Sequence, residues 1–324
     1  MDHPDAGTRS LRLEAEVRTL RNDIAAAEVI PALAAAGIAS ILLKGASIAS
    51  WLYGEDERRT YGDLDLLVSP DDMAHAGSVA ESLGFRHFRE MESTRIDSES
   101  HHEIWLRDLD AVVLELHRSF VGIGVPDDVA WDELSRHVEP MALDVGDFAA
   151  PVLAVPARAL LVALHAAVHG AKGQTLTDLE RALQRVPAEA WAEAAVLARR
   201  LRAEPAFAIG LSFVPEGAEL AARLTAPEER HASVETLLWA SSAPSTAMGW
   251  ERLARTRGLG AKLRYAVREL APPPELLRHV DGRARRGPLG LAGAYLRRPF
   301  RLLRQAPGGF RAWKAVRREA RGND

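Results

Sequence analysis

The chain of 324 residues is longer than one hydrophobic core usually fills, so its length predicts more than one domain. Hydrophobic residues make up 47% and charged residues 27% of the sequence, which excludes a fibrous or wholly disordered protein. Cysteine is absent, which excludes disulfides, thiolate zinc sites, iron–sulfur clusters and a cysteine nucleophile. The net charge of −4 conceals an asymmetry, because residues 251–324 hold 19 Lys and Arg against 6 Asp and Glu.

Targeting signals are not evident in the sequence. Residues 1–30 carry charges throughout and lack the basic segment and apolar core of a signal peptide. No stretch reaches the about 18 uncharged apolar residues of a membrane-spanning helix. We therefore expect a cytoplasmic protein without a transmembrane segment, either dissolved or peripheral at a membrane. The basic C-terminal part can bind an anionic membrane surface, RNA or the acidic remainder of the chain.

In chain order, the first predicted element is helical. Residues 9–37 are rich in Ala, Leu, Glu and Arg, and we assign residues 1–37 to an N-terminal helical segment. An apolar run at residues 38–43 predicts a strand, which stops at Lys44 and Gly45. Residues 48–53 have helical spacing, so this segment predicts a strand, a glycine turn and a helix.

More strands are predicted after this turn. Residues 64–68 form a compact apolar strand, and a helix follows it. Residues 85–88, 102–106 and 111–117 also predict strands. We therefore expect an α+β domain over residues 38–150, built on a small mixed or antiparallel sheet with helices.

From Pro156 onward the sequence changes to repeated helical periodicity, and we assign residues 151–271 to an all-helical domain. After three consecutive prolines at 272–274, arginine clusters alternate with apolar groups. We expect residues 272–324 to form a basic, amphipathic, helical C-terminal extension.

Asp63 and Asp65 are the most informative pair in the chain. Side chains two residues apart on a strand project to the same face, at roughly 6.5–7 Å between Cα atoms. Two carboxylates at this spacing repel when ionised, and a divalent cation with oxygen ligands removes the repulsion. The pair therefore favours magnesium, and the alternative is a pair of surface acids that caps a strand.

Two other segments add chemistry to this pair. Lys44 and Gly45 lie where a strand stops and a helix starts, and the free amides of a helix N-terminus bind phosphate oxygens. Residues 112–117 alternate as a strand, which places Glu115 and His117 on one face. The alternative for Glu115 is an edge-strand acid that faces solvent. A phosphate cradle with a metal-holding acid pair is typical of phosphoryl transfer.

The order of these residues resembles the polymerase-β-like nucleotidyltransferase superfamily, and most of all its poorly characterised bacterial branch. There a Leu-Lys-Gly turn precedes an Arg-X-X-Gly-Asp-X-Asp-X-Leu-Val strand and a later Glu-Leu-His strand. The matching positions are Leu43, Lys44, Gly45, Arg59, Gly62, Asp63, Asp65, Leu67, Val68, Glu115, Leu116 and His117. The helix at 161–170 and the following Asp178 also match, so the resemblance spans residues 38–185.

The resemblance implies roles for individual residues. The catalytic and metal-binding acids would be Asp63, Asp65 and Glu115, with Mg²⁺ or Mn²⁺ as the cofactor and an NTP as the substrate. The nucleotide-binding positions would be Lys44, Gly45, Ser47 and Arg59. Contacts to nucleotide or acceptor are expected from His117, His165, His169, Lys172 and Asp178. This chain departs from the usual Gly-Ser or Gly-Gly turn, because its serine lies one place later.

Some of these side chains have simpler alternatives. Lys44 can pair with the acids in the absence of nucleotide. His165 and His169 lie on one helical face, a spacing that suits a transition metal, nucleotide contacts or buried hydrogen-bonded histidines. His102 can reach the face of the acids across a hairpin, and Tyr53 is interpreted as a core aromatic.

The sequence thus predicts a magnesium-dependent nucleotidyltransferase that moves an NMP from an NTP to an acceptor and releases pyrophosphate. The acceptor is open among a small molecule, a peptide, a protein and RNA. One alternative is a non-catalytic nucleotide- or RNA-binding module of the same fold. Another is a metal-dependent hydrolase or nuclease, which needs a histidine-rich ligand set that the sequence does not display.

Overall fold

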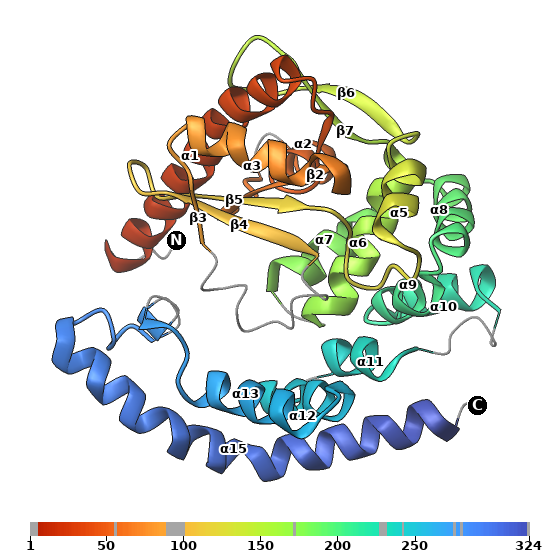
Figure 1. Ribbon diagram of the computed structural model, residues 1–324. Helices are drawn as coiled ribbons and strands as arrows, with labels where there is room; N and C mark the ends of the chain where they lie inside the picture. The colour runs from red at the N-terminus through yellow and green to blue at the C-terminus, as the bar shows by residue number, and fades with distance from the viewer. Residues whose placement is uncertain are drawn as a thin grey trace.

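The structure, a computed structural model, describes residues 6–54, 57–88, 101–170, 173–226, 232–241, 243–274, 277–278 and 281–322. Seven strands of this part form one sheet with the order β3-β4-β5-β2-β1-β7-β6 (Figure 1). The strands are β1 (Ser40–Leu42), β2 (Asp63–Val68), β3 (Arg86–His87), β4 (His102–Arg107), β5 (Val112–His117), β6 (Val138–Ala142) and β7 (Ala149–Leu153). β2 pairs with β5 and β1 with β7 in parallel, whereas the other pairs are antiparallel. The predicted α+β class with a mixed sheet is confirmed.

One face of the sheet is covered by α1 (Ala6–Ala35) and by α3 (Met73–Ser82), which follows the short 3-10 helix η1 (Pro70–Asp72). The period of two along β2 and β5 sends Leu64, Leu66, Leu114 and Leu116 to this face, where all four are buried. Buried residues of α1, such as Leu33, belong to the same cluster. The N-terminal helix therefore shares its core with the sheet.

The opposite face is covered by α6 (Val155–His169), which continues directly from β7. Around it lie α2 (Ala46–Leu52), α5 (Asp127–Leu134), α7 (Gly173–Arg185), α8 (Ala188–Arg200), α9 (Glu204–Leu211) and α10 (Pro215–Leu224). Ile41 and Leu67 of the sheet belong to one buried cluster with Leu161 and Trp191 of the helices. The sheet and the helical region thus share a continuous core on this side.

The β6–β7 hairpin extends the sheet beyond the strands that the sequence pattern predicts. Pro140 and Pro151 are register partners in this hairpin, and proline in a segment argues against a strand. β7 also pairs with β1 through Leu42 and Val152. The expected boundary at residue 150 therefore falls inside β7, and the sheet runs on to Leu153.

The C-terminal part forms a separate layer of helices, drawn in cyan and blue in Figure 1. Its helices are α11 (Val234–Ala240), α12 (Ser245–Arg255), α13 (Leu259–Leu270) and α15 (Gly287–Gly322). α12 packs along α15, where the rings of Trp250 and Phe310 lie 5.3 Å apart. The predicted helical tail is confirmed by α15. Within the described residues, no helix is long and apolar enough to cross a membrane.

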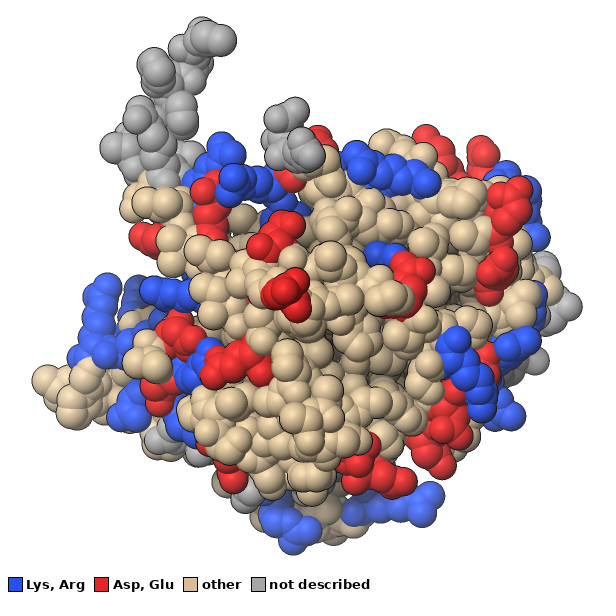
Figure 2. Space-filling model, turned by 90° about the horizontal axis from the view of Figure 1, so that it is seen from above, with Lys and Arg blue, Asp and Glu red and all other residues tan. Residues whose placement is uncertain are grey.

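Charged side chains are mixed in sign on the face that Figure 2 shows. Blue Lys and Arg and red Asp and Glu side chains alternate around its rim, and the surface between them is mostly uncharged. The visible described part of this face therefore offers no continuous surface of one sign to a polyanion.

Candidate active site

The three acids that the sequence singles out lie on two neighbouring strands. Asp65 is the register partner of Glu115 across β2 and β5, and Leu67 is the partner of His117. Because adjacent strands lie about 4.8 Å apart, Asp63, Asp65 and Glu115 share one region on the same face of the sheet. Buried leucines between them pack into the opposite core and fix both strands. The structure therefore places these three side chains on one face of the sheet, but among the described residues the ligand atoms within 4.8 Å of one another are those of His102, Glu115 and His117 and not those of the three acids.

Two cationic side chains of the protein contact Asp65. Lys44 Nζ lies 2.6 Å and His117 Nε2 lies 2.9 Å from Oδ1 of Asp65. His117 Nε2 also lies 3.3 Å from Oε2 of Glu115. The pairing of Lys44 with an acid, which the sequence allows in the absence of nucleotide, is thus confirmed. His117 thus bridges Asp65 and Glu115, and Lys44 joins them through Asp65.

This network affects the two aspartates in opposite ways. Burial raises the pKa of Asp65, but the Lys44 ammonium and the His117 imidazole outweigh burial and hold that pKa well below its ordinary value. Burial, together with repulsion from Asp65 and Glu115, raises the pKa of Asp63 to about 6. Burial lowers the pKa of His117, but hydrogen bonds to Asp65 and Glu115 outweigh it, so the pKa is raised. The network therefore favours an ionised Asp65 beside a protonated His117.

His102 joins the acids from the next strand, β4. It is the register partner of His117, and its Nε2 atom lies 3.9 Å from Oε2 of Glu115. His102, Glu115 and His117 each offer one ligand atom, and these atoms lie within 4.8 Å of one another. Carboxylate oxygens suit Mg²⁺, whereas added imidazoles suit transition metals. The predicted reach of His102 is confirmed, and the fold assembles a histidine-containing ligand set that the sequence does not display.

The turn between β1 and α2 has a backbone that requires glycine. Gly45 has a φ of 61°, and a Cβ atom at this position would lie 3.1 Å from Cδ2 of Tyr61. The turn places Lys44 beside the acids. Ser47 is fully buried, and its hydroxyl donates to the carbonyl of Leu43 at 2.8 Å. The hydroxyl that the resemblance assigns to the nucleotide is therefore turned into the protein.

Arg59 is tied to the helical region by a buried ion pair. Its Nε and Nη2 atoms donate to the two oxygens of Asp178 at 3.0 and 2.8 Å. Tyr53 and Gln174 also donate to Asp178 Oδ1, at 2.7 and 3.2 Å. Nη1 of Arg59 is buried without a hydrogen-bond partner among the residues that the structure describes. Tyr53 therefore has a polar role beyond that of a core aromatic.

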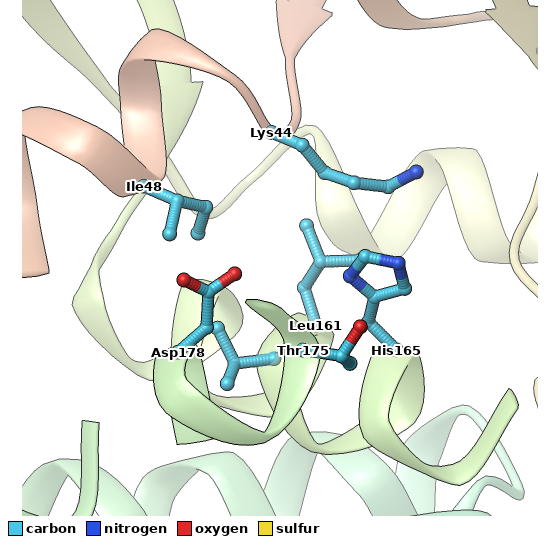
Figure 3. Close-up of a pocket in the computed structure, with 7 residues that line it drawn as sticks. Lys44, Ile48, Leu161, His165, Thr175 and Asp178 are labelled. Carbon is cyan, nitrogen blue, oxygen red and sulfur yellow. The ribbon is translucent and has the colours of Figure 1, made fainter. Parts of the chain in front are cut away.

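A small pocket lies between the glycine turn and the helices (Figure 3). It is lined by Lys44, Ile48, Leu161, Val162, His165, Thr175 and Asp178. Figure 3 shows Lys44 extending past His165, with Asp178 on the other side of the opening. Burial, Lys44 and His169 hold the pKa of His165 well below its ordinary value, so this imidazole is neutral. The cavity volume of about 10 Å³ is roughly that of one water molecule, so the pocket as it stands does not hold a nucleotide.

The remaining candidate residues lie at the edge of this region. The rings of His165 and His169 are 4.5 Å apart, and no third metal ligand joins them in the described part of the chain. Lys172 lies outside the described residues. Gln174 and Thr175 on α7 are site residues that the sequence reasoning missed. Uncharged polar side chains on a helix carry no pattern that distinguishes them from a solvated face.

Comparisons with known proteins identify the family of this chain. A search of curated proteins gives no match to the chain. The sequence profile of the uncharacterised nucleotidyltransferase family matches residues 6–217, from α1 to the start of α10, and includes every strand of the sheet. The matched segment is more than half of the chain and holds the acids, the glycine turn and the pocket. This protein therefore belongs to the uncharacterised nucleotidyltransferase family.

Proposed function

We propose that the protein transfers an NMP from an NTP to a hydroxyl or phosphate group of an acceptor, in a reaction that depends on a divalent cation. The observation that carries the proposal is the convergence of Asp63, Asp65 and Glu115 beside Lys44. The family supports nucleotidyl transfer in general terms. The dependence on a cation, the use of an NTP and the transfer to an acceptor are proposed here in addition.

The donor set fits a divalent cation. The carboxylates of Asp63, Asp65 and Glu115 offer the hard oxygen ligands that Mg²⁺ and Mn²⁺ take. Lys44 and His117 offset the negative charge of Asp65, whereas Asp63 remains repelled by the other two acids. When bound, the cation would neutralise charge on the triphosphate and lower the pKa of the acceptor hydroxyl. The imidazoles near Glu115 favour Mn²⁺ over Mg²⁺ if they join the ligand set.

The cationic side chains around the acids are proposed to hold the triphosphate. Lys44 exchanges its bond to Asp65 for a phosphate oxygen, and the backbone at Gly45 approaches the phosphates closely. Arg59 offers its unpartnered Nη1 atom. It also lies close enough to Asp65 for the charge of that carboxylate to raise the pKa of Arg59. The Ser47 hydroxyl donates to the carbonyl of Leu43 and the Ser47 backbone amide donates to the carbonyl of Lys44, so the proposed role of Ser47 is to hold the turn that carries Lys44.

The proposed reaction is a single displacement at the α-phosphorus. The acceptor oxygen forms a bond to the α-phosphorus while the bond between that phosphorus and the oxygen bridging to the β-phosphate breaks. Pyrophosphate leaves with the electron pair of the broken bond. Glu115, whose pKa is kept low by His117 in spite of burial, accepts the proton of the acceptor hydroxyl.

The parts of the chain have distinct proposed roles. We assign catalysis to residues 38–150, and we propose that the helical region 151–271 closes over nucleotide and acceptor. His165, Thr175 and Asp178 in that region line the pocket next to Lys44. His169, Lys172 and His117 complete the proposed contacts. Residues 1–37 support the sheet, and residues 272–324 form the extension.

The histidines beside Glu115 favour a second candidate, a metal-dependent phosphoester hydrolase. A water molecule would then replace the acceptor hydroxyl as the nucleophile. A single assay separates the candidates. The protein is incubated with each of the four NTPs labelled at the α-phosphate, with Mg²⁺ or Mn²⁺, and with panels of small molecules, peptides, proteins and RNA.

Label on an acceptor or on the protein, with pyrophosphate released, supports the transferase. Free labelled NMP without labelled acceptor supports the hydrolase, and NTP binding in calorimetry without turnover supports a binding module. Asp65→Asn should abolish turnover. Asp108→Asn, which changes an exposed acid, is the matched control and should retain it.

A further inference from the structure

The outward face of α15 carries large apolar side chains. Leu289, Leu296, Phe300 and Leu303 have 89, 72, 74 and 69% of their surface exposed. The successive spacings of seven, four and three residues place these side chains on one side of a helix. A helix face that points into water normally carries polar residues, so this face needs an explanation.

The fold determines which side of α15 faces outward. Ala294 and Val316, on the other side of the helix, are 2% and 9% exposed. Trp313 donates its ring N–H to Glu251 of α12 at 2.7 Å. Trp250 of α12 donates to the carbonyl of Ala306 at 3.2 Å. The inward side is thus occupied by neighbouring helices, and the apolar stripe remains on the outside.

Arginines flank this stripe. Arg297, Arg301, Arg304 and Arg311 are exposed beside it. The sequence contains no Asp or Glu from residue 287 to residue 318. The outward face therefore joins exposed hydrocarbon to a run of arginines that has no acidic residue within the same stretch of helix.

The neighbouring helix α13 repeats the apolar part of this pattern. Leu259, Leu263 and Val267 follow one another at four-residue steps and are 87, 66 and 53% exposed. α13 contacts α15 through the same layer of helices. Exposed apolar stripes are thus a property of this C-terminal layer.

The combination of exposed apolar side chains and arginines on α15 distinguishes between three kinds of binding partner. RNA would pair with the arginines but would leave the leucine and phenylalanine stripe without a hydrocarbon partner. A second copy of the chain would cover the stripe but would bring two sets of arginines together without acids between them. The boundary of an anionic bilayer offers phosphates and acyl chains at the same surface.

We propose that the outward face of α15 binds an anionic lipid membrane. Its Leu and Phe side chains enter the boundary between headgroups and acyl chains, and its arginines reach lipid phosphates from the flank of the helix. The helix lies in the plane of the membrane surface. This binding is independent of the proposed nucleotidyl transfer.

The test is co-sedimentation of the full chain with vesicles of phosphatidylcholine alone or of phosphatidylcholine with phosphatidylglycerol. We expect binding to the anionic vesicles only. Raising NaCl from about 0.1 M to about 1 M should release most of the protein, because the screening length falls from about 10 Å to about 3 Å. Equal binding to both vesicles at both salt concentrations would overturn the electrostatic part of the proposal.

Two sets of substitutions separate the apolar and the charged contributions. Leu296→Gln with Phe300→Gln should lower partitioning roughly tenfold or more, because apolar burial drives insertion. Arg297→Gln, Arg301→Gln and Arg304→Gln together should lower it roughly a hundredfold, at about 1 kcal/mol per arginine. Leu109→Gln with Val129→Gln is the matched apolar control, since Leu109 is 93% and Val129 is 44% exposed outside α15. Arg136→Gln, Arg199→Gln and Arg200→Gln together are the charge control, and circular dichroism checks that each variant is folded.

Three results would contradict membrane binding. One is the absence of the wild-type protein from both vesicle pellets. Another is tight binding of a labelled single-stranded RNA that the arginine variant loses and the Leu296 and Phe300 variant keeps. The third is a dimer in analytical ultracentrifugation that the Leu296 and Phe300 variant dissolves, with no vesicle binding by the wild type.

Discussion

The ammonium group of Lys44 lies 2.6 Å from Oδ1 of Asp65, so the glycine turn delivers a cation to the acid that a divalent metal would use. Both side chains are largely buried, since 19% of Lys44 and 5% of Asp65 is exposed. A lysine and a metal ion cannot both contact the same carboxylate oxygen at close range without repulsion. We therefore predict that Lys44 and a divalent cation compete for Asp65 when no nucleotide is present.

Lys44→Met tests this competition. The variant should bind Mn²⁺ in the absence of nucleotide roughly tenfold more tightly, because a positive charge next to the ligand is removed. Its nucleotidyl transfer should fall by roughly a hundredfold, because a donor to the phosphates is lost. Isothermal titration calorimetry measures the first effect, and Lys262→Met is the control. Weaker Mn²⁺ binding by Lys44→Met would show that the lysine supports the metal site and does not compete with it.

Asp63→Asn and Asp65→Asn should change stability in opposite directions in metal-free buffer. Asp65→Asn leaves the buried Lys44 and His117 without their carboxylate and should lower the free energy of unfolding by about 3 kcal/mol. Asp63→Asn removes a repelled charge and should leave that free energy unchanged or higher. Urea denaturation with EDTA at mildly alkaline pH measures both. The idea fails if the two variants are equally destabilised.

Asp63 also predicts a pH dependence of stability. Its pKa is about 6 in the folded protein and 3.8 without the fold, so the native state binds more protons between these values. Stability from this group is therefore greatest below the lower value and is lost as pH rises through the upper one, with a total of about 3 kcal/mol. The measured quantity is the free energy of unfolding of the wild type minus that of Asp63→Asn, across this pH range and without metal. A difference that grows with pH would refute the assignment.

The Arg59–Asp178 pair should contribute far more to stability than an exposed pair of the same kind. Its side chains are 6 and 4% exposed, whereas those of Arg86 and Asp108 are 52 and 67% exposed. Asp178→Asn leaves a buried guanidinium without its partner and should cost about 3 kcal/mol. Asp108→Asn should have little measurable effect, because water screens its pair. Chemical denaturation of both variants gives the comparison, and similar losses would mean that burial does not strengthen the pair.

Gly45→Ala should affect both stability and turnover. Gly45 and Gly37 both have positive φ, of 61° and 78°, but only Gly45 has a side chain, that of Tyr61, within 4 Å of the added Cβ. Gly37→Ala therefore measures backbone strain alone, at about 1 kcal/mol. Gly45→Ala should lose more stability and, because the turn carries Lys44, most of its turnover. If Gly45→Ala and Gly37→Ala have the same stability and the same turnover, the close approach of Tyr61 to Gly45 matters for neither property.

Much of the candidate site could be predicted from local sequence pattern. β2 begins Asp-Leu-Asp-Leu and β5 ends Leu-Glu-Leu-His, so the side on which Asp63, Asp65 and Glu115 lie follows from the strand period of these segments. The glycine turn follows from an apolar run that ends at Lys44 and Gly45. These features are local, and a single strand or turn contains all the information that they need.

The contacts between distant segments could not be predicted in the same way. The alignment of Asp65 with Glu115 depends on strand register, which the intervening chain does not encode in any short pattern. The bond from Arg59 to Asp178 joins residues 119 positions apart and engages the Nε and Nη2 atoms of Arg59, which no local pattern indicates. β6 and β7 escape prediction because each contains a proline.

β1 has three residues, yet it is bonded to β2 on one side and to β7 on the other. Lys44 follows its end closely, Asp63 and Asp65 lie on β2, and β7 leads straight into the helix that carries His165. A strand this short cannot shift without breaking both sets of backbone bonds. An arriving ligand therefore meets a preorganised frame, and its binding energy remains available for the transition state and is not consumed in assembling the reacting groups.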